Sequence, residues 1–197
     1  MIDRARILPR GPLTMALSLR DAYTQEHGGR VEILCIELGR RLGLDAVPLD
    51  TLAAAARLHD VGKIGIPDSI LFKPGRLDPG EWEQMKAHSA AGAMICARLD
   101  RADAAAIARL VRHHHEWFDG SGYPDGLAGE DIPLGSRIIS VVDSYDAMIT
   151  RRAYQAARGH DAVMEILRQE RGIKGDPRVF DLFAGMMAEG DPGRWST

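Results

Sequence analysis

The chain has 197 residues, of which 45% are hydrophobic and 27% charged, a composition typical of one globular domain and not of a disordered protein. Its net charge of −3 argues against a general binder of nucleic-acid polymers. Its apolar stretches are too short to cross a bilayer, its first residues lack a signal-peptide pattern, and Cys35 and Cys96 suit buried free thiols. We therefore expect a cytoplasmic protein with no membrane partner.

Helical periodicity runs along nearly the whole chain. Apolar residues recur at steps of three and four from Leu19 to Leu42, which predicts a long first helix that Gly43 can end. The Gly28–Gly29 pair inside it indicates a close neighbour or a bend, because each glycine costs about 1 kcal/mol relative to alanine. A second helix follows and carries His59 and Asp60 at its C-terminal end.

The pattern stays helical after this point. Asp78, Pro79 and Glu81 suit the N-cap, N1 and N3 positions of a helix whose apolar face includes His88. Further helices are expected at about 103–116, 134–150, 161–171 and 177–188. Residues 120–133, with four glycines and two prolines, read as a loop. The sequence predicts an all-α bundle, a single domain over residues 1–197 with its core at about 12–190.

Histidines and aspartates stand on the apolar faces of several of these helices. One such residue, for example His27 or His88, is more often a hydrogen-bonded core histidine than a metal ligand. Burying many titratable groups together is unfavourable without a metal, whereas divalent cations accept imidazole and carboxylate ligands readily. The joint pattern predicts a metal centre, in which Asp60, beside His59 at a helix end, is the natural bridge between two ions.

Three motifs carry a resemblance to a known family. His59-Asp60 precedes Gly62-Lys63, residues 114–124 read His-His-Glu-Trp-Phe-Asp-Gly-Ser-Gly-Tyr-Pro, and Asp143 begins Asp-Ser-Tyr-Asp-Ala-Met. With these motifs the chain resembles the HD-GYP family of the HD phosphohydrolase superfamily. The likeness covers most of the chain, and the motif at residues 114–124 is its most specific part.

The resemblance implies a fold, an activity and a cofactor. The fold would be an HD-type helical bundle with its Gly-Tyr-Pro loop over the metal site. The activity would be hydrolysis of cyclic di-GMP to the linear dinucleotide or GMP in bacterial second-messenger signalling. The cofactor would be iron or manganese, although zinc, nickel and cobalt suit the same ligand types. By position, the metal ligands would be His27, His59, Asp60, His88, His114, His115 and Asp143.

The resemblance also implies roles toward the substrate. Lys63 would hold a phosphate oxygen and, with Asp60, take part in the in-line attack of water on phosphorus. Gly122, Tyr123 and Arg152 would meet the substrate. The alternatives are a surface lysine at position 63 and a loop that only connects two helices.

Other residues of these motifs have expected supporting roles. Glu116 and Asp119 are candidate partners for ligand imidazoles, and Asp146 is expected to orient a ligand and not to bind metal. Trp117 and Phe118 are expected to pack beneath the loop, with stacking on guanine as the alternative.

The chain departs from the family pattern at a few positions. Tyr23 stands where members with three metals have a glutamate, so we expect two divalent ions and no third. Ala153 and Gln155 replace a proline and a basic residue, which leaves the exact cyclic dinucleotide open. The alternatives are a catalytically weak signalling or binding module, and an HD hydrolase of another nucleotide. A regulatory protein or a second copy of the chain is a further candidate partner.

Overall fold

The structure is a computed structural model that describes residues 12–150 and 158–189. Within these ranges the chain is helical, and its only β-type pairing is an isolated bridge between Arg171 and Gly175. The helices in chain order are α1 (Pro12–Arg20), α2 (Ala22–Arg41), α3 (Ala46–Leu58), η2 (Val61–Gly65), α4 (Asp68–Leu71), α5 (Pro79–Cys96), α6 (Ala104–Arg112), η3 (Gly129–Asp131), α7 (Leu134–Ile149), α8 (His160–Gln169) and α9 (Pro177–Glu189). The predicted all-α fold is confirmed.

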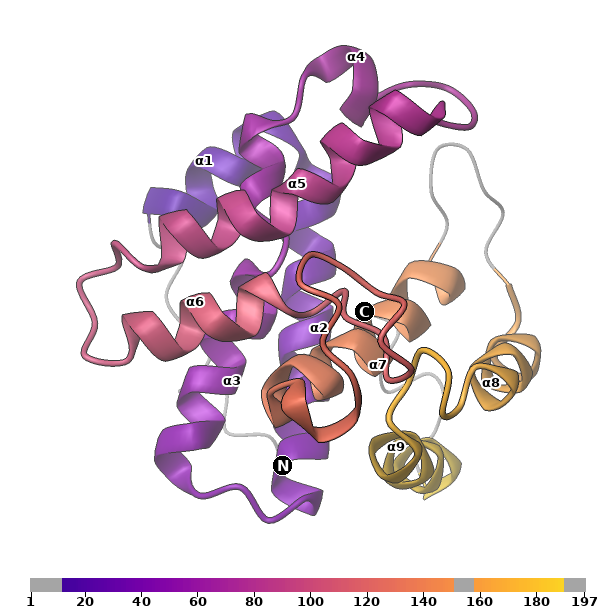
Figure 1. The fold of residues 1–197 in the computed structure, drawn as a ribbon. Helices are drawn as coiled ribbons and strands as arrows, with labels where there is room; N and C mark the ends of the chain where they lie inside the picture. The colour runs from indigo at the N-terminus through magenta and orange to yellow at the C-terminus, as the bar shows by residue number, and fades with distance from the viewer. Residues whose placement is uncertain (1–11, 151–157, 190–197) are drawn as a thin grey trace.

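Helix α2 lies at the centre of the bundle, in contact with α1, α3, α7 and α9 (Figure 1). The core between these helices is apolar and includes four consecutive buried alanines of α3, residues 53–56. Small side chains let the backbones approach closely: a Cβ added to Gly28 of α2 would lie 2.8 Å from the carbonyl oxygen of Arg57 on α3. The glycine pair in α2 therefore marks a close helix contact. No helix within the described ranges is long and apolar enough to span a membrane.

The predicted first helix is in fact two helices. The chain breaks at Asp21, whose side chain caps α2 by accepting a hydrogen bond from the backbone N–H of Thr24. Leu19, expected on the buried face of that helix, lies instead on α1 and is 84% exposed. The C-terminal end of α2 is as predicted. Gly43, just after the helix, takes a φ of +78°, a conformation that glycine adopts without strain.

One later helix start is as predicted and one helix end is not. Asp78 and Glu81 form a reciprocal capping box at the start of α5. Helix α6 ends at Arg112, earlier than the predicted residue 116. The imidazoles of His113 and His114 hydrogen-bond back to backbone carbonyls of α6, at 2.8 and 2.6 Å, after the chain has left the helix. The first two residues of the histidine run therefore close the helix without extending it.

Asp103 joins the start of α6 to α3, which makes the fold sensitive to acid. Its carboxylate accepts hydrogen bonds from Arg101 and from the hydroxyl of Thr51, all at 2.8 Å. The Arg101 guanidinium holds the pKa of Asp103 at about 2, below the usual value for aspartate. Because the folded state favours the ionised carboxylate, this stabilisation is present above about pH 4 and is lost as the pH falls toward 2.

We expect Asp103→Asn to lower the free energy of unfolding by about 1 kcal/mol at pH 7, after allowance for screening by solvent, and by about half as much at pH 3. Urea titrations at the two pH values measure both differences. Asp50→Asn is the matched control, because Asp50 contacts the same arginine at 2.7 Å from an exposed position. Equal losses for the two variants, or a loss at Asp103 that does not change with pH, would contradict the expectation.

Candidate metal centre

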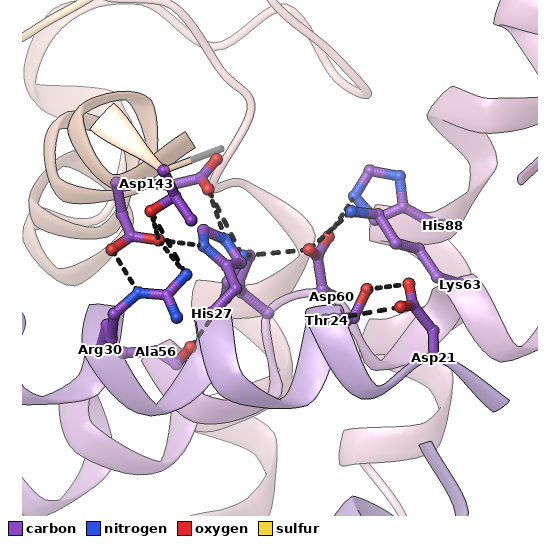
Figure 2. Close-up of polar contacts among 12 residues, drawn as sticks. Asp21, Thr24, His27, Arg30, Ala56, Asp60, Lys63, His88 and Asp143 are labelled. Carbon is purple, nitrogen blue, oxygen red and sulfur yellow. Dashed lines mark hydrogen bonds and ion pairs between the residues drawn. The ribbon is translucent and has the colours of Figure 1, made fainter. Parts of the chain in front are cut away.

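Five segments of the chain bring imidazoles and carboxylates to one region of the bundle. Figure 2 shows His27 and Asp60 in its middle, with Asp143 on one side and His88 and Lys63 on the other. Helix α2 provides His27, and the end of α3 provides His59 and Asp60. Helix α5 provides His88, the loop after α6 provides His114 and His115, and α7 provides Asp143. The structure therefore brings together the residues that the resemblance implies as ligands.

One group of potential ligands, the first triad, consists of His27, His59 and Asp60. Their ligand atoms all lie within 4.8 Å of one another. Asp143 adjoins this triad, with its Oδ1 2.9 Å from His27 Nε2 and 3.6 Å from His59 Nε2. The first triad with Asp143 thus offers two imidazoles and two carboxylates to one cation.

A second triad consists of His88, His114 and His115, whose ligand atoms also lie within 4.8 Å of one another. Asp60 stands between the two triads, with Oδ2 3.4 Å from His59 Nε2 and Oδ1 3.5 Å from His88 Nε2. The two oxygens of this carboxylate therefore face imidazoles of different triads, an arrangement that suits a ligand shared by two ions.

Three of the imidazoles are oriented by the backbone of their own segment. The Nδ1–H groups donate to carbonyl oxygens three residues earlier, at 2.7, 2.7 and 2.6 Å, in His59, His88 and His114. A carbonyl can only accept, so Nδ1 carries a proton, and in the neutral imidazole Nε2 is left with a lone pair. These three Nε2 atoms are buried and have no hydrogen-bond partner among the described residues. Buried polar atoms without partners are costly, and a bound cation removes that cost, so the residues fit a metal.

His27 is oriented differently, by a carboxylate. Its Nδ1 lies 2.6 Å from Asp146 Oδ2, and both oxygens of Asp146 accept hydrogen bonds from Arg30, at 2.8 and 2.9 Å. Asp146 thus contacts the far side of a candidate ligand, as expected of an orienting residue. Arg30 was not predicted, although its position three residues after His27 on α2 places both on one helix face.

The surroundings favour neutral imidazoles at His114 and His115 of the second triad and an ionised carboxylate at Asp60 of the first. Burial lowers the pKa of His114 well below its usual value and that of His115 to about 3. Burial opposes ionisation of Asp60, but the positive charge of Lys63 outweighs it and holds the pKa of Asp60 well below its ordinary range. The centre therefore presents lone pairs and negative charge, which are the donors that a divalent cation requires.

Lys63 and the Gly-Tyr-Pro loop lie beside this centre. Lys63 stands in η2 directly after the His-Asp pair, and its ammonium group is 2.6 Å from Asp60 Oδ2. The backbone N–H of Tyr123 donates to the carbonyl of His115 at 3.1 Å, and the two rings are 4.9 Å apart between centroids. A Cβ on Gly122 would lie 2.2 Å from the backbone nitrogen of Trp117, so the loop is folded tightly on the motif. Arg152 lies outside the described residues.

The interpretation of Glu116 and Asp119 as partners of ligand imidazoles is wrong. The carboxylate of Glu116 accepts the backbone N–H groups of Asp125 and Leu127, at 2.8 and 3.1 Å. That of Asp119 accepts the backbone N–H and the hydroxyl of Ser121. Both residues therefore shape the loop, and the second nitrogen of three ligand imidazoles is already bonded to a backbone carbonyl.

Comparisons with known proteins agree with this geometry. Residues 13–179 match the family model described as HD domain. The chain is 39% identical over 196 residues to the probable cyclic di-GMP phosphodiesterase of Vibrio cholerae serotype O1, a match that covers 92% of this chain and 44% of that protein. It is 40% identical over 169 residues to the cyclic di-GMP phosphodiesterase response regulator RpfG of Xanthomonas campestris pv. campestris, covering 86% and 45%. The chain thus spans less than half the length of these two relatives.

The same fold is found in solved structures. The cyclic GMP-AMP specific phosphodiesterase V-cGAP3 of V. cholerae has a TM-score of 0.69 at 18% identity, over 93% of this chain and 50% of that one. At this level of identity the likeness shows the fold alone. The family match extends over most of the chain, and the structure brings its His-Asp pair and its Gly-Tyr-Pro loop together at one centre. The chain belongs to the HD domain family, within its HD-GYP group.

Proposed function

We propose that this chain is a metal-dependent phosphodiesterase that hydrolyses cyclic di-GMP to the linear dinucleotide, to GMP or to both, in bacterial second-messenger signalling. The observation that carries the proposal is the pair of adjacent triads that Asp60 joins. Their buried imidazole nitrogens lack hydrogen-bond partners among the described residues. The names of the two curated relatives, both cyclic di-GMP phosphodiesterases, support the choice of substrate.

We propose two divalent ions, iron or manganese. The first triad with Asp143 would hold one, the second triad the other, and Asp60 would bind both. At position 23, where a third ion would need a carboxylate, the phenol ring of Tyr23 stacks parallel to the ring of His27, with centroids 6.1 Å apart. When bound, the ions supply Lewis acidity that activates water and neutralises charge on the phosphate.

The other residues of the site suit a phosphodiester. Lys63 would exchange its contact with Asp60 for a nonbridging phosphate oxygen, and would donate a proton to the leaving alkoxide. Burial raises the pKa of Tyr123, so its phenol keeps its proton and would donate a hydrogen bond to the phosphate. Gly122 lets the loop fold so that Tyr123 lies beside the second triad. Arg152 would provide a further positive charge. The buried free thiols of Cys35 and Cys96 support a cytoplasmic location.

The test is turnover by anaerobically purified protein loaded with iron or with manganese. We expect two ions per chain and hydrolysis of cyclic di-GMP in preference to cyclic GMP-AMP and to bis(p-nitrophenyl) phosphate, with products separated by chromatography. Binding of cyclic di-GMP by the fully loaded protein without turnover would identify a signalling module instead. Preferred cleavage of a different nucleotide would contradict the proposed substrate.

A further inference from the structure

A tryptophan that the family motifs do not include lies near the centre. Trp82 is on α5, six residues before His88, which is about 9 Å along a helix axis. Its side chain is 47% exposed, unusual for so large an aromatic residue. The indole meets the ring of Tyr123 edge to face, with centroids 6.2 Å apart and planes at 82°. Trp82 therefore borders the Gly-Tyr-Pro loop on the side of α5.

A continuous series of rings joins Trp82 to the second triad. The ring of Tyr123 is 4.9 Å from that of His115, and His115 is 5.0 Å from His88. The ammonium group of Lys86, one turn after Trp82 on α5, lies 5.7 Å from the centre of the Tyr123 ring and favours its position through a cation–π contact. Trp82 is thus the outermost ring of a series that begins at candidate metal ligands.

The tryptophan inside the family motif is placed differently. The ammonium group of Lys174 lies 4.9 Å from the centre of the Trp117 ring, and the neighbouring Phe118 hydrogen-bonds through its backbone to the carbonyl of Lys174. Trp117 thus contacts the turn before α9. Its ring is covered by Lys174, whereas nearly half of the Trp82 side chain is exposed.

We propose that Trp82 is a specificity-determining residue that stacks on one nucleobase of the cyclic dinucleotide. The inference rests on the proposed function. The metal ligands, Lys63 and Tyr123 act on the phosphate, and a base, which is joined to the phosphate through a ribose, must lie farther out. An indole that is 47% exposed and lies beyond Tyr123 suits such a base, since every base has a π-face that stacks on aromatic side chains.

Two measurements on the metal-loaded protein test the inference. In calorimetric titration with the hydrolysis-resistant phosphorothioate analogue of cyclic di-GMP, Trp82→Ala should raise the Kd at least about tenfold, and Trp82→Phe should recover most of the affinity. Hydrolysis of methyl p-nitrophenyl phosphate, which has no nucleobase, should keep its kcat/KM within about twofold in both variants. Met94→Ala is the control, because it removes another exposed apolar side chain of α5, 75% exposed, near the opposite end of the helix.

The outcomes separate the inference from the proposed function. If the wild-type protein binds the analogue and Trp82→Ala binds it equally well, the inference is overturned and the proposed function stands. Equal losses toward the analogue and the small diester also overturn it, since they would show that Trp82 only positions Tyr123. A wild-type protein that cleaves the small diester and binds no cyclic dinucleotide contradicts both.

Discussion

Asp60→Asn is expected to remove bound metal and hydrolysis together. The amide has the shape of the carboxylate but neither its charge nor its second acceptor oxygen, and Asp60 faces an imidazole of each triad, at 3.4 and 3.5 Å. Without this carboxylate, neither proposed cation would have a full set of donors. We expect metal content to fall from two ions to less than one per chain, and turnover of cyclic di-GMP to fall on the order of a thousandfold. Elemental analysis and product chromatography measure the two losses.

The control for this variant is Asp181→Asn, which neutralises an exposed aspartate paired with Arg171 at the surface, and which should change neither quantity. Circular dichroism shows whether the Asp60 variant keeps its helices. Full activity with two bound ions in Asp60→Asn would refute the assignment of the centre.

Gly62→Ala is expected to be strongly destabilising, although it adds only one methyl group. A Cβ at this position would lie 1.9 Å from the carbonyl oxygen of His88 and 2.5 Å from the backbone nitrogen of Gly92. Both atoms belong to the backbone of α5, which cannot give way as a flexible side chain can. Separating η2 from α5 would also move His88 away from Asp60. We expect a loss of about 3 kcal/mol or more in the free energy of unfolding, measured by urea denaturation of the metal-free protein.

Gly65→Ala is the matched control in the same short helix. A Cβ at Gly65 meets no atom within 4 Å, so the free energy of unfolding should change by less than about 0.5 kcal/mol. An insoluble Gly62→Ala protein beside a soluble Gly65→Ala protein would agree with the expectation. Equal stability of the two variants would show that η2 and α5 are not in the close contact described.

Local signals in the sequence were enough to predict most of the helices and the meeting of the candidate ligands. The capping box at Asp78 and the glycine at position 43 depend only on their neighbours in the chain, and both are found in the structure. The candidate ligands were identified by their motifs and by their places on apolar helix faces. Periodicity failed at Asp21, because the apolar pattern continues through a break that a side-chain cap produces.

Features that depend on how distant segments meet were not predictable in this way. Arg30 on α2 and Asp146 on α7 form their ion pair only where the two helices meet. The same contact between helices brings Asp146 to the imidazole of His27. The contact between Trp82 and Tyr123 depends on the path of the long loop after α6. The role of Glu116 was misjudged for a related reason: its carboxylate is taken up by backbone N–H groups of the loop, and backbone carbonyls already bind three of the imidazoles, which nothing in the motif reveals.

The separation of the candidate ligands along the chain has a consequence for the folded state as a whole. They span residues 27 to 143 and come from five segments, so two cations that share the Asp60 carboxylate would together cross-link most of the bundle. Binding that occurs only in the native state adds its free energy to that of folding. The lifetime of this protein in a cell would then follow the supply of its metal, and starvation for that metal would remove the protein itself as well as the proposed activity.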